Sequence, residues 1–302
     1  MSFFETMVKH GLPFVPRFIV GKVASRYVAG ETLEDAVRTI RELNGEGAMA
    51  TVDVLGEEIT ERDKVEGAVG VYLQLFETIE AERLDCNVSI KLTMLGLRID
   101  REYCFANVRR ILDRAKAKNN FVRIDMEDHT CTDDTLEIFR RLHEDYDNVG
   151  VVLQARLRRT LADIGSLLPL KPDVRLCKGI YVEPRERAWL AYETVRTNFI
   201  AGLEKLLGNG AYVGIATHDE HLVWAGMAAV DRFGLGPEQY EFQMLLGVDP
   251  ELRRLILSAG HRLRVYVPFG RDWYPYSTRR LRENPAVARH VIRAMLGLRS
   301  RG

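Results

Sequence analysis

Charged side chains stand within or directly after apolar, β-branched runs of this chain. Lys91 lies in the segment SIKL, and Arg175 and Lys178 lie in VRLCK. A Lys or Arg in an apolar strand is costly to bury without a partner, so these segments predict paired charges or a bound anion. A structural network of ion pairs is the alternative for each residue taken alone.

Acidic, amide, hydroxyl and imidazole side chains follow the same pattern within or at the ends of other predicted strands. They are Asp53, Glu57, Asp125, Glu127, Asp128, Gln154, Thr217, His218, Asp219 and Tyr266. Polar groups at the ends of many successive strands favour a shared binding or catalytic site over isolated structural pairs.

A second candidate anion site lies near the end of the chain, in the segment DWYPYSTRRLRE. This segment predicts a helix with Pro275 in its first turn. Four residues spaced i, i+3, i+4 and i+7 then share one face, and these are Tyr276, Arg279, Arg280 and Glu283. Two neighbouring guanidinium groups can hold a carboxylate while Glu283 orients one of them. A solvated outer face is the alternative.

Common catalytic and metal-binding signatures are missing from the sequence. No Gly-x-Gly-x-x-Gly follows a predicted strand, and there is no Walker loop and no Gly-x-Ser-x-Gly turn. The histidines have no metal-binding spacing, so we predict no metal site. Lys178 could activate Cys177, but a small buried hydrophobic residue is the simpler interpretation.

Eight β-rich runs alternate with longer segments of helical periodicity. The runs span residues 47–54, 86–92, 121–126, 149–154, 173–178, 211–217, 240–245 and 263–268. Between them, segments such as 31–43, 61–82, 102–118 and 185–207 carry apolar residues at helical spacing and exposed charges. The pattern predicts strands covered by helices.

This alternation predicts the α/β class and a single (β/α)₈ barrel domain over residues 1–302. We expect residues 1–30 to form an N-terminal helical arm and residues 31–302 to form the barrel. A doubly wound sheet is the rival fold. Only the residues FGRD separate the eighth strand from the arginine-rich helix, so that helix should lie at the carboxyl end of the strands, where barrel enzymes place their sites.

The composition narrows the setting of the protein. Its 302 residues contain 43 basic and 43 acidic side chains, so total charge attracts it neither to nucleic acid nor to an acidic membrane. Four cysteines without paired spacing, and a start without a signal-peptide pattern, predict a cytoplasmic protein. The aromatic and basic residues near the N-terminus leave peripheral contact with the inner face of the membrane open.

Six motifs together resemble those of the monofunctional bacterial proline dehydrogenases, and the resemblance runs from about residue 30 to the end. They are SIKLTMLGL, RIDMED, VVLQA, VRLCKGIYVEP, IATHD and VYVPFGRDWYPYSTRRLRE. The resemblance implies a flavoenzyme that oxidises L-proline to Δ1-pyrroline-5-carboxylate by hydride transfer to N5 of FAD. A quinone would then take the electrons, and a separate dehydrogenase would consume the product.

The resemblance also implies roles for individual residues. Asp125 and Arg175 would be catalytic, with Arg175 beside the flavin N5. The substrate would contact Lys91, Arg279, Arg280, Tyr266, Tyr181 and Glu57, where the two arginines and the lysine hold its carboxylate and Glu57 gates entry. FAD would contact Met126, Gln154, Lys178, Gly179, Ile180, Thr217 and His218. Ile180 departs from the smaller residue of several family members, and it could change substrate affinity.

Two other functions stay open at this stage. A Schiff-base aldolase could use Lys91 or Lys178 on the same barrel. A non-enzymatic module could use the arginine-rich C-terminal segment to bind a membrane or nucleic acid.

Overall fold

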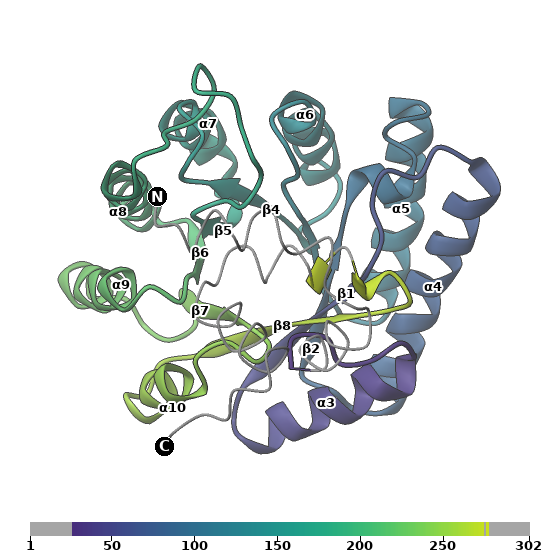
Figure 1. The fold of residues 1–302 in the computed structure, drawn as a ribbon, viewed down its shortest axis with the longest axis horizontal. Helices are drawn as coiled ribbons and strands as arrows, with labels where there is room; N and C mark the ends of the chain where they lie inside the picture. The colour runs from purple at the N-terminus through teal and green to yellow at the C-terminus, as the bar shows by residue number, and fades with distance from the viewer. Residues whose placement is uncertain (1–25, 275, 278–302) are drawn as a thin grey trace, which may run out of the picture.

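The computed structural model of the protein describes residues 26–274, 276 and 277. Eight parallel strands close into a barrel in which each strand pairs with its neighbours in sequence and β8 pairs with β1 (Figure 1). The strands are β1 (Met49–Val54), β2 (Cys86–Ile90), β3 (Val122–Ile124), β4 (Val149–Gln154), β5 (Asp173–Cys177), β6 (Tyr212–Ala216), β7 (Tyr240–Leu245) and β8 (Leu263–Phe269). The predicted fold class is confirmed.

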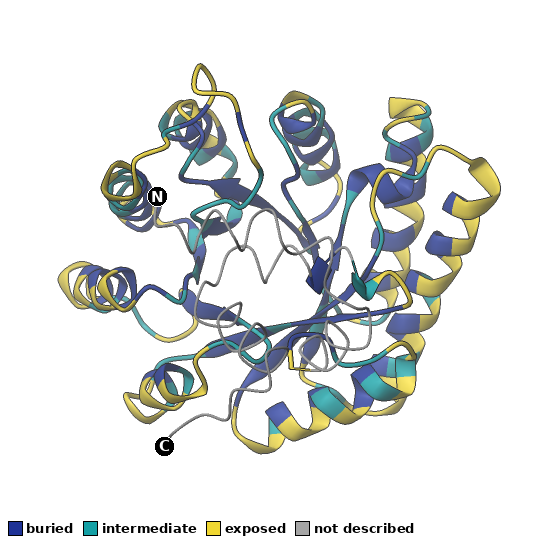
Figure 2. Ribbon diagram, in the orientation of Figure 1, coloured by how far each residue is buried: buried dark blue, intermediate teal, exposed yellow. Residues whose placement is uncertain are grey.

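Helices form a ring outside the barrel (Figure 1). They are α3 (Leu33–Gly45), α4 (Arg62–Ala81), α5 (Arg101–Ala117), α6 (Thr132–His143), α7 (Thr160–Leu167), α8 (Tyr192–Leu207), α9 (Glu220–Phe233) and α10 (Pro250–Ser258). Each turns a buried face to the strands and an exposed face to solvent (Figure 2). The hydrophobic core is therefore a layer between strands and helices, to which Val52, Val88 and Val151 contribute.

The start of α3 shows how local sequence sets an element. Thr32 accepts a hydrogen bond from the backbone N–H of Asp35, and the Asp35 carboxylate accepts one from the backbone N–H of Thr32. This capping box satisfies amide groups that a helix start leaves without partners. Behind it, Ile40 and Leu43 are buried, so the helical periodicity of 31–43 places its apolar side on the barrel.

The predicted helix 185–207 is wrong in its first turns, because α8 begins only at Tyr192. The chain before it pairs with the β4–α7 loop through an isolated bridge between Leu157 and Ala188. The backbone N–H of Trp189 donates to the carbonyl of Arg156 at 2.8 Å. This pairing with a distant loop satisfies backbone groups that helical periodicity alone would have assigned to a helix turn.

Inside the barrel the side chains are unusually polar, and two glycines make room for them. A Cβ on Gly150 would lie 2.3 Å from Nη1 of Arg123, and a Cβ on Gly214 would lie 2.5 Å from Nε2 of Gln243. Real Cβ atoms do not approach other atoms so closely, so the absence of a side chain at these positions lets long polar groups cross the interior.

Two predicted segments fall partly or wholly outside the described residues. Residues 273, 274, 276 and 277 are helical, in agreement with the predicted start of the C-terminal helix. Arg279, Arg280 and Glu283 lie outside the described residues. The predicted N-terminal arm also lies outside them up to residue 25. Within the part of the chain that the structure describes, no helix has both the length and the apolar composition needed to cross a membrane.

Candidate active site

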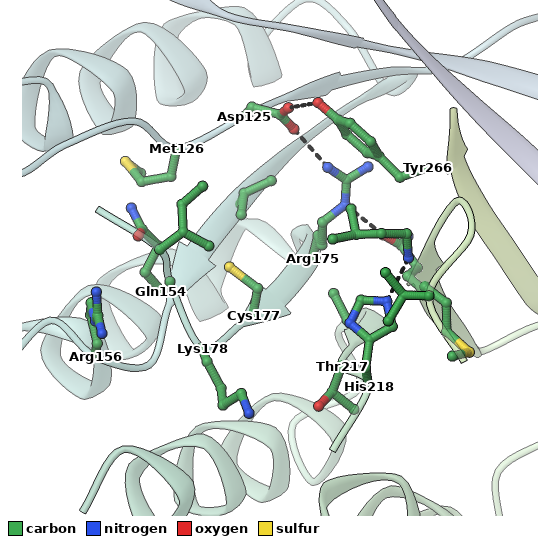
Figure 3. A pocket seen from close by; sticks show the side chains of 18 of the residues that line it. Asp125, Met126, Gln154, Arg156, Arg175, Cys177, Lys178, Thr217, His218 and Tyr266 are labelled. Atoms are coloured by element: carbon green, nitrogen blue, oxygen red, sulfur yellow. Dashed lines mark hydrogen bonds and ion pairs between the residues drawn. The ribbon is translucent and has the colours of Figure 1, made fainter. Parts of the chain in front are cut away.

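A cavity of about 500 Å³ opens at the carboxyl ends of the strands. Its volume is in the usual range for small-molecule and cofactor sites, roughly 300–1,000 Å³. Its lining includes Lys91, Asp125, Met126, Gln154, Arg175, Lys178, Gly179, Ile180, Tyr181, Thr217, His218 and Tyr266. These residues come from six of the eight strands or from the loops that follow them, so the closed barrel brings distant motifs together (Figure 3).

At one side of the cavity a lysine is held by carboxylates from two other strands. Lys91 Nζ lies 2.6 Å from Oδ1 of Asp53 and 4.0 Å from Oδ2 of Asp125. Burial opposes the charge of Lys91, but the neighbouring carboxylates outweigh it and raise its pKa above the usual value. Lys91 is therefore a cation at the wall of the cavity.

Tyr266 closes this cluster. Its hydroxyl donates to Oδ2 of Asp125 at 2.8 Å (Figure 3). The same hydroxyl lies 3.4 Å from Nζ of Lys91. Burial, followed by the charges of Asp125 and Asp53, raises the pKa of Tyr266 well above its usual value. Tyr266 therefore stays a neutral phenol that can donate a hydrogen bond.

Arg175 crosses the barrel interior with all three of its nitrogens engaged. Nη1 donates to Asp125 at 2.6 Å, Nη2 donates to Ser89 at 3.0 Å, and Nε donates to Gln243 at 2.5 Å. The guanidinium carbon lies 5.3 Å from the centre of the Tyr266 ring. Partners from four other strands or their ends fix the cation in one orientation.

The opposite side of the cavity contains a cradle with an unused acceptor. Gln154 donates through Nε2 to the carbonyl of Glu127 at 2.7 Å, whereas its buried Oε1 has no hydrogen-bond partner. Gly179 has a φ of +92°, and a Cβ there would lie 2.6 Å from that oxygen. Glycine thus leaves open the space in front of an acceptor that a ligand could use.

Two cations flank this cradle. Arg156 lines the cavity, and its buried Nε has no hydrogen-bond partner. Lys178 Nζ lies 3.0 Å from Oδ2 of Asp219. The Asp219 carboxylate also binds Arg196 and the Tyr192 hydroxyl, and these groups hold its pKa well below the usual value although burial opposes this. The arrangement provides positive charge for an anionic group such as a phosphate.

Two further lining residues have defined partners. The Nε2 atom of His218 accepts a hydrogen bond from the backbone N–H of Leu245 at 2.7 Å. The backbone N–H of Thr217 donates to the carbonyl of Gln243 at 3.1 Å. Cys177 also lines the cavity, where burial raises its pKa to about 11. It is therefore a neutral thiol at physiological pH and a poor nucleophile.

Most of the side chains predicted from sequence lie around this one cavity. Glu57 is exposed on the β1–α4 loop and is not among the described residues that line it. Arg279 and Arg280 lie outside the described residues, although Tyr276, on the same predicted face, does line the cavity. Ile180 is also part of the lining.

Sequence reasoning missed several residues of the site. Arg156 lies two positions after Gln154, Gln243 lies in a strand interior, and Ser89 precedes Lys91 by two. The two-residue spacing in Gln154 and Arg156, and in Ser89 and Lys91, could have identified two of them, because alternate residues along a strand share a face. Within residues 26–274, 276 and 277, no three His, Cys, Asp or Glu side chains are grouped to hold a metal.

Comparison with known proteins gives several bacterial relatives of nearly the same length. Proline dehydrogenase of Deinococcus radiodurans is 38% identical over 279 residues, which are 91% of this chain and 90% of that protein. Proline dehydrogenase 1 of Bacillus subtilis strain 168 is 36% identical over 273 residues, 90% of each chain.

Larger proteins match with only part of their length. The bifunctional protein PutA of Escherichia coli strain K12 is 25% identical over 336 residues, 96% of this chain but 25% of that protein. The crystal structure of proline utilization A from Bdellovibrio bacteriovorus, inactivated by N-propargylglycine, superposes with a TM-score of 0.81 at 24% identity. The superposition covers 88% of this chain and 33% of the PutA chain, and it supports the fold alone.

The family model described as proline dehydrogenase matches residues 36–293, a range that contains all eight strands and the cavity residues named above. Together with relatives that share more than a third of their residues over nine tenths of the chain, this match identifies the protein as a member of the proline dehydrogenase family.

Proposed function

We propose that this protein oxidises L-proline to Δ1-pyrroline-5-carboxylate with FAD as its cofactor. The observation that carries the proposal is the juxtaposition, in one cavity, of the Lys91, Asp125, Arg175 and Tyr266 cluster with the cradle of Gln154 and Gly179. One side offers a cation for a carboxylate, and the other offers an open acceptor flanked by cations. Membership of the proline dehydrogenase family supports this assignment.

The residues of the cradle suit FAD. The unpartnered Oε1 of Gln154 can accept from an N–H of the flavin ring, in the space that Gly179 leaves open. Arg156 and Lys178 can hold the phosphate groups, while Met126, Ile180, Thr217 and His218 contribute to the rest of the wall. When bound, FAD would accept a hydride at N5.

Proline would bind with its carboxylate against positive charge. Lys91 provides a cation in the cavity wall, and we assign Arg279 and Arg280 of the C-terminal segment to the same carboxylate. Tyr266 and Tyr181, which both line the cavity, would pack against the ring. Glu57, on the loop above strand β1, would pair with the arginines and control entry.

Asp125 and Arg175 are the proposed catalytic residues. Oxidation removes a hydride from the ring carbon next to nitrogen and a proton from the nitrogen, and a C=N bond forms. Arg175 would provide a fixed cation near the position at which a bound flavin receives electron density, and Asp125 holds both Arg175 and Tyr266. A preoriented charge of this kind stabilises a transition state without reorganising during the reaction.

The geometry disfavours the aldolase alternative. A Schiff base needs a neutral amine, whereas the carboxylates around Lys91 raise its pKa above the usual value. Lys178 is held within 3.0 Å of Asp219, whose pKa is well below normal, so that carboxylate remains charged. Lys91 is therefore not prepared as a nucleophile, and the Lys178 amine is engaged in an ion pair.

We further propose that a quinone reoxidises the flavin by taking two electrons and two protons. A separate pyrroline-5-carboxylate dehydrogenase would consume the product. We place the protein in the cytoplasm, with peripheral contact to the membrane as a route to the quinone. The composition, with balanced charge and unpaired cysteines, supports this placement.

The decisive experiment is the visible spectrum of the purified protein before and after anaerobic addition of L-proline. We expect flavin bands that bleach with L-proline but not with glycine or L-alanine, which lack the ring. A colourless protein that gains no proline-dependent reduction when FAD is supplied would refute the proposed function. Arg279→Met and Arg280→Met should each raise the KM for proline roughly ten- to hundredfold while flavin stays bound.

A further inference from the structure

A chain of buried and partly buried hydrogen bonds runs from the β1–α4 loop to the proposed cofactor cradle. Its central residue is Thr93, which lies in a short 3₁₀ turn after β2 and is fully buried. The Thr93 hydroxyl accepts from the backbone N–H of Glu58 at 2.9 Å and donates to Oε2 of Glu127 at 2.5 Å. One side chain thus joins the loops that follow three strands.

Backbone groups reinforce both connections of Thr93. Its carbonyl accepts from the N–H of Ile59 at 3.0 Å, and its own N–H donates to Oε1 of Glu127 at 3.0 Å. The Glu127 carbonyl in turn accepts from Nε2 of Gln154 at 2.7 Å. The β1–α4 loop and Gln154 are therefore connected through two residues, Thr93 and Glu127.

The loop end of this chain is conformationally demanding. Glu58 has a φ of +58°, in the left-handed region that non-glycine residues seldom adopt. Its carboxylate is held by Arg98 at 2.9 Å, and Arg98 also donates to Thr130 at 3.1 Å. Such a conformation persists only where surrounding contacts enforce it, and the Thr93 hydroxyl is one of those contacts.

Glu127 is an unusual residue for a purely structural position. It is 3% exposed, and its carboxylate accepts hydrogen bonds from the backbone N–H and the hydroxyl of Thr93. Burial raises its pKa above the usual value, and the charge of Glu57 acts in the same direction. A buried carboxyl group is costly, and here its two oxygens hold the hydroxyl and the backbone N–H of Thr93, which an apolar residue could not do.

We propose that Thr93 and Glu127 are positioning residues that hold the β1–α4 loop, which carries Glu57, over the substrate side of the cavity. They also fix the position of this loop relative to Gln154 on the cofactor side. The idea that this loop serves substrate entry rests on the proposed function. The hydrogen-bonded path itself, and its effect on the loop, do not depend on it.

The test compares Thr93→Val, which keeps the shape but removes the hydroxyl, with Thr93→Ser, which retains the hydroxyl. On the purified flavin-containing protein, amide hydrogen exchange is followed at Glu58 and Ile59, and proline kinetics are measured. Losing one hydrogen bond should speed exchange at both amides roughly two- to tenfold in Thr93→Val. KM for proline should rise by up to the same factor, with kcat and flavin content close to wild type.

Exchange at Ile59 is the informative readout, because its N–H bonds to the backbone carbonyl of residue 93, which valine retains. If Thr93→Val matches Thr93→Ser in Ile59 exchange and in KM, the proposal is overturned. It is also overturned if Thr93→Val lowers kcat or flavin content while KM is unchanged. If Thr93→Val does not fold, Glu127→Gln, of nearly equal size, decides by the same measurements.

A different result would contradict the proposed function. If wild-type protein shows no proline-dependent bleaching, the assigned reaction is wrong, whatever the variants do. If wild type is active and Thr93→Val resembles it in both loop exchange and KM, only the positioning role is wrong.

Discussion

Ion pairs fill the barrel interior at both ends, yet the two ends differ in what these pairs face. At the amino ends of the strands, Arg264 binds Glu241 at 2.7 Å and Arg123 binds Asp173 at 2.6 Å. At the carboxyl ends, Lys91 binds Asp53 and Arg175 binds Asp125, each at 2.6 Å. The residue types and distances are nearly the same.

The amino-end pair of Glu241 and Arg264 is closed by protein groups. Glu241 accepts from Arg264, Tyr212 and Gln243, and Arg264 also donates to the carbonyl of Ala50. Burial disfavours the charge of Glu241, but Arg264 overcomes this and lowers its pKa to about 2. The carboxyl-end residues Lys91, Asp125 and Arg175 instead line the cavity.

This difference shows that the distance within an ion pair does not reveal its role. A pair whose hydrogen-bonding capacity is taken up by the protein acts on stability, because removing one partner leaves a buried charge. A pair that borders a cavity can direct its charge at a ligand. The two ends should therefore respond differently to equivalent substitutions.

The largest effect is expected from Arg264→Met at the amino end. Leaving Glu241 buried without its cation should lower the free energy of unfolding by about 3–5 kcal/mol. Thermal unfolding, followed by circular dichroism, should therefore shift down by roughly 6–20 °C. The kcat/KM for proline of the folded protein should stay near wild type.

The matched control is the double variant Arg264→Met with Glu241→Met, which removes both charges and should recover much of the lost stability. A single variant as stable as wild type, or a double variant no better than the single, would contradict the interpretation of the amino-end pair.

At the carboxyl end, Arg175→Met should act mainly on catalysis. Removing a preoriented cation from the site should lower kcat/KM for proline by about 100- to 1,000-fold. The loss of stability should be smaller than for Arg264→Met. Asp125 still accepts a hydrogen bond from the Tyr266 hydroxyl, and because it borders a cavity its charge is less completely enclosed by protein. Steady-state kinetics and thermal unfolding together check this. Near-normal activity with a large loss of stability would contradict the proposed difference, because the carboxyl-end pair would then act on stability like the amino-end pair.

A pair of identical substitutions sharpens the contrast. Tyr266→Phe removes the hydroxyl that donates to Asp125 and should lower kcat/KM for proline roughly tenfold. Tyr212→Phe removes the hydroxyl that donates to Glu241 at 2.9 Å, and it should cost about 1 kcal/mol of stability with little effect on activity. Reversed outcomes in the two variants would show that the assignment of roles to the two ends is wrong.

The last prediction concerns how the stabilisation by the amino-end pair depends on pH. Because the pKa of Glu241 in the folded protein is about 2, below its unfolded value of about 4.3, its ionised form stabilises the fold at neutral pH. This contribution is complete above the unfolded pKa and is lost as pH falls toward 2. The stability difference between wild type and Glu241→Gln should stay constant from pH 7 to about 4.5 and narrow below that. Narrowing that begins near pH 6 would exclude Glu241 as the titrating group.

Strand positions were the part of the fold that sequence patterns predicted well. All eight runs overlap observed strands, because β-branched runs flanked by helical periodicity carry strong local signals. Residues 185–191 were assigned wrongly to a helix, since their conformation depends on a bridge to Leu157. Local periodicity cannot report a partner from a loop some thirty positions away.

The candidate site also has a part that the sequence predicted and a part that it did not. Lys91, Asp125, Arg175 and Tyr266 could be selected as unusual because a charged or polar residue in an apolar strand is visible in the sequence. Which partner each one binds was not predictable, and Thr93 and Glu127 gave no sign that they connect the loops after three strands. The amino-end residues Glu241 and Arg264 show the same sequence pattern as the site residues, although they do not line the cavity.

The sequence by itself determined the order of strands and helices, the family, and the residue types available at the strand ends, since these depend on local periodicity and on short motifs. Only the tertiary structure decided which charges meet and which of them face a cavity. The physical reason is that closing the barrel brings together residues that are far apart in the chain, as with Tyr266 and Asp125 or Arg175 and Ser89. Burial then determines whether a given charge stabilises the fold or remains open to a ligand.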